Sequence, residues 1–251
     1  LLTKDYNYEQ KFTVSTCSED GLAFTSTGVN KGGLFCGDIN TQYKYQSSII
    51  DVNVDTNSNI STKIAIDEIM PHTKTIVSFK FPDEKSGKLE MQFLHEHVGI
   101  TSSIGLTPKP VIDFSWAIGS EVFTVGGELG YETASGLFTK YNAGIGITKP
   151  EFGAAVILAD KGDTLKASYL HAVNPLAKTY VAAEISRRFS ANENTFTVGS
   201  SYALDPITTV KTRLNNHGKL GALLLHEFMP KSLISLSGEF DTKALDKSPK
   251  I

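Results

Sequence analysis

The sequence predicts an all-β fold, an up-and-down antiparallel barrel that spans a membrane. Extended runs of roughly ten residues recur along the 251-residue chain, and apolar and polar residues alternate in them with the period of a β-strand. Short polar or Gly/Pro turns separate the runs, as in successive hairpins. No segment has the roughly 18 consecutive apolar residues of a transmembrane helix, but a spanning strand needs only about ten residues, of which every second one faces lipid.

The alternating runs number about 18. In chain order, they lie near residues 11–17, 21–29, 33–45, 48–56, 60–67, 74–81, 87–96, 98–106, 111–118, 121–132, 136–148, 152–159, 163–172, 178–188, 194–203, 207–215, 219–228 and 231–241. No stretch has a helical stripe, and none resembles a linker or a second domain. We therefore expect a single domain over residues 1–251.

Each run has one apolar and one polar face. Ile50, Val52 and Val54 alternate with Asp51 and Asn53, and the other runs repeat this pattern. Two architectures fit: a soluble sandwich, in which the apolar faces meet, and a closed barrel in lipid. About 18 strands are too many for a barrel filled by side chains, so a closed barrel would hold water inside and turn its apolar face to lipid. The short, regular hairpins favour the barrel over the sandwich.

Composition and motifs narrow the function. The formal net charge of -3 gives no strong field that would attract nucleic acid. The two cysteines, Cys17 and Cys36, are expected to be free thiols. His95 and His97 are expected on one face of a strand beside a turn, but no third ligand accompanies them, so we predict no metal site. No catalytic constellation and no cofactor motif is found, and we predict that the chain is not an enzyme.

A signature in the C-terminal part of the chain is the most specific motif. Residues 202–216 read YALDPITTVKTRLNN, and residues 221–224 read GALL. This pattern resembles the signature of the eukaryotic mitochondrial porins, the voltage-dependent anion channels. Residues 81–88, 160–163 and 173–175 look like the plant branch of that family, and the resemblance covers essentially the whole chain.

The resemblance implies a 19-stranded barrel with an N-terminal helix in its lumen. About 18 strands are visible here, and residues 1–10 look like the remnant of the helix and its linker. The last strand of the family would follow Ile251, so the sequence looks like a trimmed chain. Without that strand, the run near 11–17 would keep an unpaired edge unless the remaining strands close differently.

The resemblance also implies a function. The family forms voltage-gated, weakly anion-selective pores of the mitochondrial outer membrane, through which metabolites, nucleotides and small ions diffuse. Its partners are membrane lipid, permeating anions and nucleotides, further copies of the chain, and, only loosely, hexokinase-type peripheral proteins. Two alternatives stay open: the pore subunit of a mitochondrial protein-import translocase, which is a distant relative, and a soluble β-sandwich binding module.

Alternation predicts which charged side chains line the lumen, where their collective field would select among ions. The predicted pore-lining charges are Lys11, Lys44, Lys63, Lys80, Lys88, Lys140, Lys166, Lys211, Arg213, Asp51, Asp55, Glu90, Glu128 and Glu184, with Asp38 and Glu239 as further inward acids. The two signs are nearly balanced, which predicts weak selectivity.

Two sites and one departure from the family follow from the resemblance alone. Lys4 matches a lysine that the family associates with nucleotide contact. Glu239, Phe240 and Asp241 match a segment that contacts dinucleotides in animal members, although Glu239 departs from the apolar residue found there. Val52 lies where animal members can carry a lipid-facing glutamate linked to gating, so this mode of regulation is expected to be absent.

Overall fold

Within the residues that the structure describes, the chain forms 18 β-strands of one sheet and one short 3-10 helix, η1 (Asp160–Gly162). This computed structural model describes residues 1–4, 6, 9–18, 20–31, 33–83, 85–174, 178–229 and 232–243. Within these ranges, no helix is long and apolar enough to cross a membrane. Each predicted run is a strand, with ends within about three residues of the prediction, so the all-β antiparallel class is confirmed.

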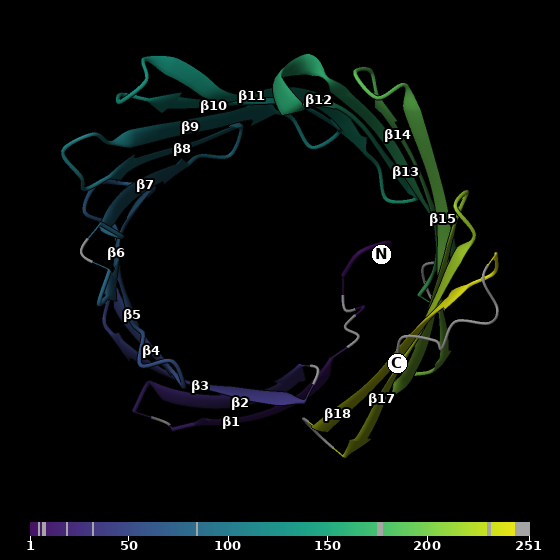
Figure 1. Cartoon of the computed structure of the whole chain (residues 1–251), viewed down its shortest axis with the longest axis horizontal. Coiled ribbons are helices and arrows are strands. Elements are labelled where there is room, and N and C mark those ends of the chain that lie inside the picture. The colour runs from purple at the N-terminus through teal and green to yellow at the C-terminus, as the bar shows by residue number, and fades with distance from the viewer. Residues whose placement is uncertain are drawn as a thin grey trace. The chain divides into compact units, whose positions relative to one another are not determined.

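The strands are distributed over two compact units. Unit 2 comprises Glu9–Gly119 and Gly126–Tyr141. Its complete strands are β1 (Gln10–Cys17), β2 (Leu22–Lys31), β3 (Leu34–Tyr45), β4 (Ser48–Asp55), β5 (Ile60–Asp67), β6 (Thr73–Phe81), β7 (Lys88–Leu94), β8 (Val98–Gly105) and β9 (Val111–Gly119). From β1 to β9, each strand pairs antiparallel with the next strand along the chain. Figure 1 shows these strands following one another along a curve.

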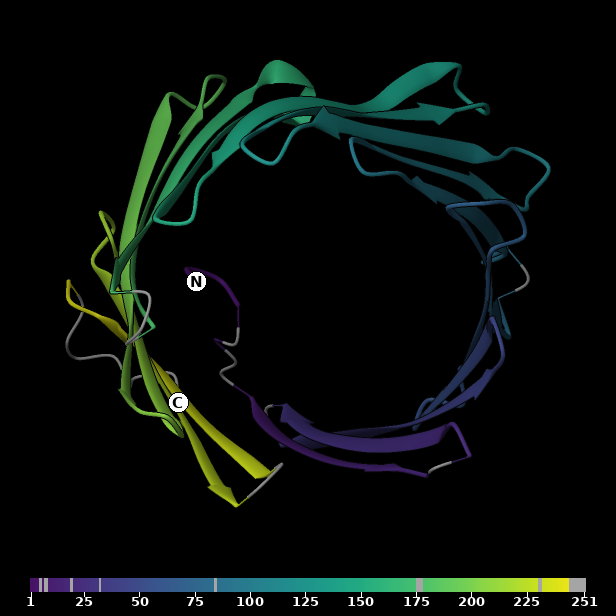
Figure 2. The ribbon, with the colours of Figure 1, turned by 180° about the vertical axis from the view of Figure 1, so that it is seen from behind.

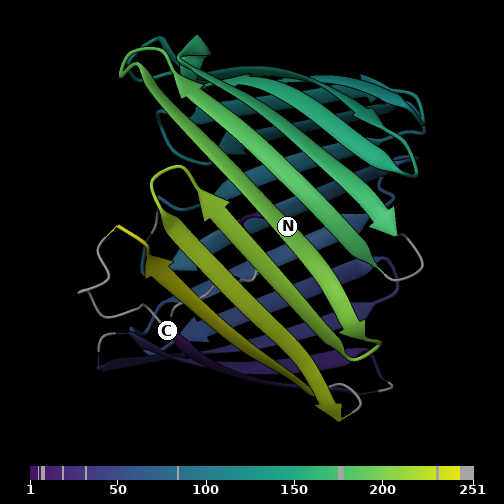
Figure 3. The same ribbon diagram turned by 90° about the vertical axis from the view of Figure 1, so that its right-hand side faces the viewer.

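Unit 1 comprises Leu1–Tyr8, Ser120–Val125 and Asn142–Ile251. Its complete strands are β12 (Phe152–Ala159), β13 (Thr164–Asn174), β14 (Thr179–Arg188), β15 (Glu193–Asp205), β16 (Thr208–Asn215), β17 (Lys219–Met229) and β18 (Ser232–Asp241). They also pair antiparallel in chain order and run side by side in Figure 3. Strands β10 (Phe123–Glu132) and β11 (Leu137–Thr148) divide their residues between the units.

The registers keep like faces together within each unit. In unit 2, Asp51 lies opposite Gln42 on one side and Lys63 on the other. In unit 1, Leu224 lies opposite Val210 and Leu236. Because directly paired residues of a sheet share a face, each unit has one polar face and one apolar face, as the alternation predicts.

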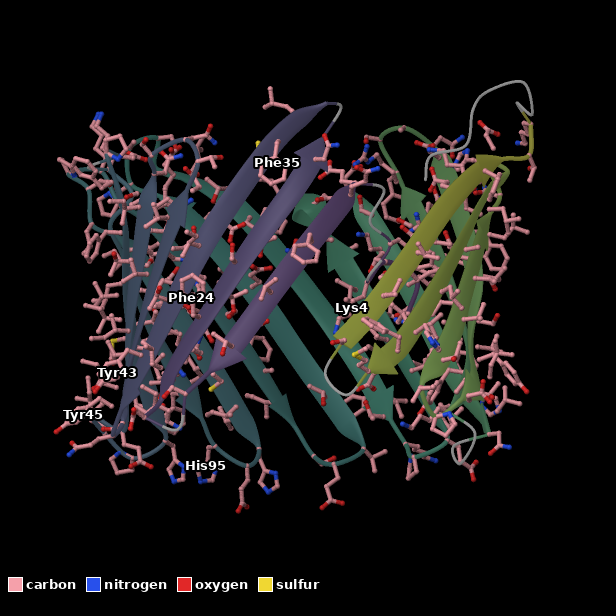
Figure 4. All side chains as sticks on the ribbon, turned by 90° about the horizontal axis from the view of Figure 1, so that it is seen from below. Lys4, Phe24, Phe35, Tyr43, Tyr45 and His95 are labelled. Carbon is pink, nitrogen blue, oxygen red and sulfur yellow. The ribbon has the colours of Figure 1, made fainter. Side chains whose placement is uncertain are left out.

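The apolar face is exposed. Phe12 and Phe35 expose 72% and 71% of their surface, and Ile118 exposes 52%. Figure 4 looks onto the convex side of β1–β3, which carries the labelled side chains of Phe24, Phe35 and Tyr43. In the described part of the chain, the buried hydrophobic residues are only Tyr6, Ala182 and Leu223. A sandwich of this length would bury its apolar side chains between two sheets at close-packed density, so the sandwich alternative does not describe this structure.

Trp116 gives the glycines of β10 a packing role. A Cβ atom added to Gly127 would lie 3.0 Å from Nε1 of the indole and 3.1 Å from Cε2. The ring therefore lies against the bare backbone of Gly127, the arrangement by which an aromatic residue covers a strand glycine. Gly126 and Gly127 both lie within β10, and their bare backbone leaves room for Trp116 of the neighbouring strand.

Two turns of unit 1 are tied together by Asp163. Its Oδ1 accepts a hydrogen bond from the Ser190 backbone N–H at 2.7 Å, and its Oδ2 accepts one from the Ser190 hydroxyl at 2.5 Å. Its backbone oxygen also accepts the N–H of Phe189 at 2.8 Å. The hydrogen bonds from Ser190, with a smaller contribution from Arg188, hold the pKa of the Asp163 carboxyl below its usual range.

Asp163→Asn should reduce the free energy of unfolding at pH 7. A carboxyl whose pKa is lower in the folded state stabilises the protein above its unfolded pKa of about 3.9 and loses that contribution as pH falls through the folded value. The gap between wild type and Asp163→Asn should therefore narrow below about pH 4. Thermal unfolding in detergent from pH 3 to pH 7 measures the gap, and Asp20→Asn in another turn is the control. A gap that is constant over this range would contradict the assignment.

Candidate functional site

The polar face of unit 2 carries ten of the predicted pore-lining charges. The strand registers place eight of them on one face: Lys11, Lys44, Asp51, Asp55, Lys63, Lys80, Lys88 and Glu90. The other two, Lys140 and Glu128, form an ion pair with each other. Asp113 belongs to the same face, because a Cβ atom on Gly130 of β10 would lie 3.0 Å from its Oδ1.

Two carboxylates on this face accept hydrogen bonds from side-chain amides. Asp38 and Asp55 are directly opposite each other, an unfavourable position for like charges. The side-chain amide of Asn53 donates to Asp38 at 3.1 Å, and that of Asn59 donates to Asp55 at 2.9 Å. Amide donors thus satisfy both acids without neutralising them.

Ion pairs account for other charges of unit 2. Lys74 lies 3.3 Å from Asp67, and Lys88 lies 3.8 Å from Glu90. Among the described residues, Lys63 and Lys80 form no ion pair. The described part of this face therefore carries cations without an ion pair together with acids without one, such as Asp38 and Asp51, and a mixed lining of this kind selects among ions only weakly.

The polar face of unit 1 holds the N-terminal segment, defined here as residues 1–4 and 6. Figures 1 and 2 both show it on the concave side of the strands of this unit. These residues contain no helix. Leu1, Leu2 and Thr3 line a hollow of about 380 Å³ together with residues of β11–β14, among them Ala182 and Glu184.

Arg213 holds this segment to the wall. Its Nη1 donates to the backbone oxygen of Leu2 at 2.9 Å, and its Nη2 donates to Oε2 of Glu239 at 3.0 Å. The guanidinium carbon also lies 4.3 Å from the ring centre of Tyr6. One side chain thus makes a charge-assisted hydrogen bond, an ion pair and a cation–π contact, for which the planar guanidinium with its fork of N–H donors is well suited.

Two glycines leave room for the segment. A Cβ atom on Gly199 would lie 2.6 Å from Cδ2 of Leu2 and 2.6 Å from the backbone oxygen of Thr212. A Cβ atom on Gly221 would lie 2.9 Å from the Arg213 side chain and 3.3 Å from the ring of Tyr6. The absence of side chains at these positions is what lets the N-terminal segment approach the sheet.

Gly199→Ala should displace the segment and weaken the fold, because the new methyl group would overlap both a backbone oxygen and a leucine. We expect a loss of about 1–3 kcal/mol in the free energy of unfolding, as for overpacked sites. Gly153→Ala is the matched control, because its Cβ atom would lie 3.8 Å from its nearest neighbour, in ordinary contact. Chemical unfolding in detergent micelles measures the difference, and equal losses in the two variants would contradict the steric role of Gly199.

The remaining predicted site residues are divided between the two faces. Lys166, Lys211 and Glu184 lie with Arg213 on the polar face of unit 1. Glu239 and Asp241 share that face, since they pair with Gly221 and Lys219, but Phe240 pairs with Leu220 on the apolar face and is 45% exposed. The structure therefore does not bring Phe240 together with its two neighbours. Lys4 is exposed, and Figure 4 shows its position.

Sequence reasoning missed Leu2 and Tyr6 as partners of Arg213. The backbone oxygen of Leu2 is 211 positions away from the guanidinium along the chain. No local pattern marks a backbone oxygen as an acceptor, and Tyr6 has only its aromatic ring as a signal. The pairing of Gly221 with Arg213 and Glu239 across β16–β18 does follow from the strand registers.

The prediction for the histidines was wrong in one respect. Strand β7 ends at Leu94 and β8 begins at Val98, so His95 and His97 lie in the connecting turn and not on a strand face. The chain reverses after Leu94, and the backbone N–H of His95 bonds the oxygen of Val98 at 2.8 Å. The ring of His95 meets His72 edge to face, with centroids 5.4 Å apart. Among the described residues, no group of three or more His, Cys, Asp or Glu could hold a metal ion.

Both cysteines are free, as predicted. Cys17 ends β1 and is exposed, and Cys36 lies in β3. In the strand registers, Cys17 lies opposite Ala23 and Cys36 lies opposite Val29, so the two cysteines do not face each other. The sheet therefore contains no disulfide between them.

Comparison with known protein families shows to which family this chain belongs. A model of the family described as "Eukaryotic porin" matches residues 1–251. The chain belongs to the eukaryotic porin family. Its resemblance to that family, seen first in the signature around Arg213, is confirmed over the whole length. A family of channel proteins carries no catalytic site, so this porin is not an enzyme.

Several curated plant proteins are similar to this porin. Mitochondrial outer membrane protein porin 5 of Oryza sativa subsp. japonica is 54% identical over 100% of this chain and 90% of its own length. Mitochondrial outer membrane protein porin 2 of Arabidopsis thaliana is 52% identical over 100% and 91%, and the outer plastidial membrane protein porin of Pisum sativum is 51% identical over 100% and 91%. Among solved structures, a mutant of Rh. blastica porin aligns with a TM-score of 0.41 and 11% identity over 92% of this chain and 88% of that chain, too distant a likeness to carry an argument.

Proposed function

We propose that this eukaryotic porin spans the mitochondrial outer membrane as a barrel and lets metabolites, nucleotides and small ions diffuse through it. One observation carries the proposal: an apolar face that is exposed along the strands, with a charged face behind it. Such an apolar surface is unfavourable in water and favourable in lipid, where a closed sheet satisfies its backbone groups internally. The charged side then needs water, and a water-filled interior provides it.

The proposed mechanism of ion passage follows from the charged face. An ion in the interior would pass Lys63 and Lys80, which form no ion pair among the described residues, and the acids and ion pairs beside them, and no bond would be made or broken. Weak and distributed attraction lets an anion enter without trapping it. We therefore expect a weak preference for anions. We also propose closure at high voltage of either polarity, as the family resemblance implies, and a role in pore lining for the charges predicted from the sequence.

Nucleotide contact is proposed for Lys4 of the N-terminal segment and for Glu239 and Asp241 of the polar face. Phe240 lies on the apolar face, so it could contact a nucleotide only from that side of the sheet. Residues 1–251 would act as one porin domain. Further copies of this chain and hexokinase-type peripheral proteins are proposed partners, with membrane lipid around the apolar face. The location in the mitochondrial outer membrane is supported by the names of the rice and Arabidopsis relatives, whereas the pea relative is named for the outer plastidial membrane.

Single-channel recording in a planar bilayer with a KCl gradient tests the pore directly. We expect stepwise insertion of large conductances, a small reversal potential of the sign that marks anion preference, and closure at both voltage polarities. Protein that circular dichroism shows to be folded β-sheet, yet gives no conductance, would overturn the proposal. Block by a mitochondrial presequence peptide, without block by nucleotides, would instead favour the import-subunit alternative. Fractionation of plant cells with outer-membrane markers of mitochondria and plastids tests the location.

A further inference from the structure

A small polar cavity at one end of β13–β15 is separate from the N-terminal segment. It has a volume of about 270 Å³, and its wall is formed by Asp160, Thr164, Lys166, Ser186, Arg188, Glu193 and Thr195. Ligand pockets usually measure about 300–1,000 Å³, so this cavity suits a small group better than a whole nucleotide. All of its residues belong to unit 1.

The strand registers make this cavity a consequence of the fold. Thr164 lies opposite Arg188, and Lys166 lies opposite Ser186. In the next pair of strands, Arg188 lies opposite Glu193 and Ser186 lies opposite Thr195. The six strand residues thus form two adjacent rows across three strands, all on the polar face.

Both cations of the cavity are available to a ligand. Within the described part of the chain, neither Lys166 nor Arg188 forms an ion pair, and both are exposed. Arg188 faces the carboxylate of Asp163, but that group is already occupied by its two hydrogen bonds from Ser190. A guanidinium and an ammonium on one wall are the donors that phosphate oxygens accept best.

One residue of the cavity wall, Thr164, carries a hydroxyl without a hydrogen-bond partner. Thr164 is only 3% exposed, and its Oγ1 is buried and makes no hydrogen bond. Buried polar atoms are nearly always paired, so an exception indicates a group that another partner can satisfy. The hydroxyls of Ser186 and Thr195 line the same wall, so an anion seated between the cations would meet donors on several sides.

The carboxylates of the cavity limit how tightly it can bind. Glu193 lies opposite Arg188 in the register and 3.7 Å from Nε2 of His217, and Asp160 is the second acid. Two cations and two carboxylates leave the site nearly neutral overall. Such a site would hold an anion weakly and release it quickly, which is what passage along a pore requires.

We propose that this cavity is a phosphate-binding subsite on the pore wall, in which Lys166 and Arg188 hold one phosphate group. The phosphate group belongs either to inorganic phosphate or to the end of an organic phosphate that passes through the pore. The inference deepens the proposed function, because it names a place where one class of permeating anion pauses. It concerns none of the residues that hold the N-terminal segment.

The test measures binding without relying on conductance. The full chain in detergent micelles is titrated with inorganic phosphate and, separately, with AMP, and the broadening of the ³¹P resonance gives the dissociation constant. Lys166→Gln/Arg188→Gln should raise that constant about tenfold, the effect of losing two partly exposed charge contacts. Glu193→Gln should lower it about threefold by removing an opposing charge. Circular dichroism confirms that each variant is folded.

Lys85→Gln/Lys109→Gln is the matched control, because it removes the same net charge from two turns of unit 2. The control should leave the dissociation constant of phosphate within about twofold of the wild-type value. Equal weakening in the control and the site variant would overturn the proposal, since only the net charge would then matter. Wild-type protein that broadens neither resonance would also overturn it. AMP binding without binding of inorganic phosphate would show that the nucleoside supplies the affinity and would contradict recognition of the phosphate group.

The same preparations separate this proposal from the proposed function. Planar-bilayer recording on the wild type shows whether the chain forms a pore at all. A conducting pore whose phosphate binding is unchanged in Lys166→Gln/Arg188→Gln would overturn the subsite and leave the pore function intact. Site-dependent phosphate binding by a protein that does not conduct would overturn the pore and leave the cavity as a phosphate site.

Discussion

Leu224→Arg should destabilise the folded protein in a bilayer by about 2–4 kcal/mol, because it places a guanidinium on the lipid-facing side of a strand. Leu224 lies near the middle of β17, between Val210 and Leu236 on the apolar face. In lipid, an arginine there must stretch toward the interface or remain poorly solvated. Urea titration of folding into phospholipid vesicles measures the loss.

Ser235→Arg is the control for that experiment. Ser235 lies on the neighbouring strand, opposite Leu225, on the polar face, and it is exposed. An added arginine there would reach water and should cost less than about 0.5 kcal/mol. If the two substitutions cost the same, the apolar face does not meet lipid and the membrane orientation of the sheet is wrong. The comparison therefore decides between lipid and water outside the apolar face.

Arg213→Ala should release the N-terminal segment from the wall of unit 1. The change removes the hydrogen bond to Leu2, the ion pair with Glu239 and the contact with the ring of Tyr6. The side chains of Arg213 and Glu239 are only 22% and 14% exposed, so Glu239 would keep a poorly solvated charge. Complete burial would make this loss about 3–5 kcal/mol. We expect about 1–3 kcal/mol, because water reaches part of the pair.

The release is measured by the anisotropy of a fluorophore attached to the N-terminus, which should fall in Arg213→Ala. Arg213→Lys keeps the charge but lacks the planar fork, so we expect an intermediate anisotropy. Lys63→Ala, on the polar face of unit 2, is the control and should leave the anisotropy unchanged. Arg213→Ala/Glu239→Ala should lose less stability than the sum of its single variants, since the carboxylate that Arg213 pairs with is then gone as well. Full additivity with unchanged anisotropy would contradict a holding role for Arg213.

The strands and their faces were predictable because both are set by local sequence. In β5 the predicted bounds of residues 60–67 are also the observed ones, and the charged residue Lys63 lies on the expected face. A strand's side chains alternate whatever the rest of the fold does, and short turns leave antiparallel pairing as the simplest connection. The prediction from alternation failed for His95, because the chain reverses after Leu94 and residues 95–97 form the turn before β8.

The family, too, was predictable, because a spaced signature is a property of the sequence alone. The signature could not show which groups its arginine, Arg213, contacts. The motif places Arg213 on the polar face, but the choice between solvent and the backbone of Leu2 depends on where a segment 211 positions away lies. Likewise, Phe240 was grouped with Glu239 and Asp241 by motif, although alternation separates it from them onto the other face.

The sequence by itself determined the number of strands, the side on which each residue lies and the family to which the chain belongs. Only the tertiary structure decided which groups meet: Arg213 with Leu2, Tyr6 and Glu239, and the backbone of Gly199 with the N-terminal segment. It also decided that Lys166, Arg188 and Thr164 line one cavity. The physical reason is the range of the interactions. Alternation is a property of neighbouring residues, whereas ion pairs, close approaches and cavities depend on the register of strands that are distant in sequence.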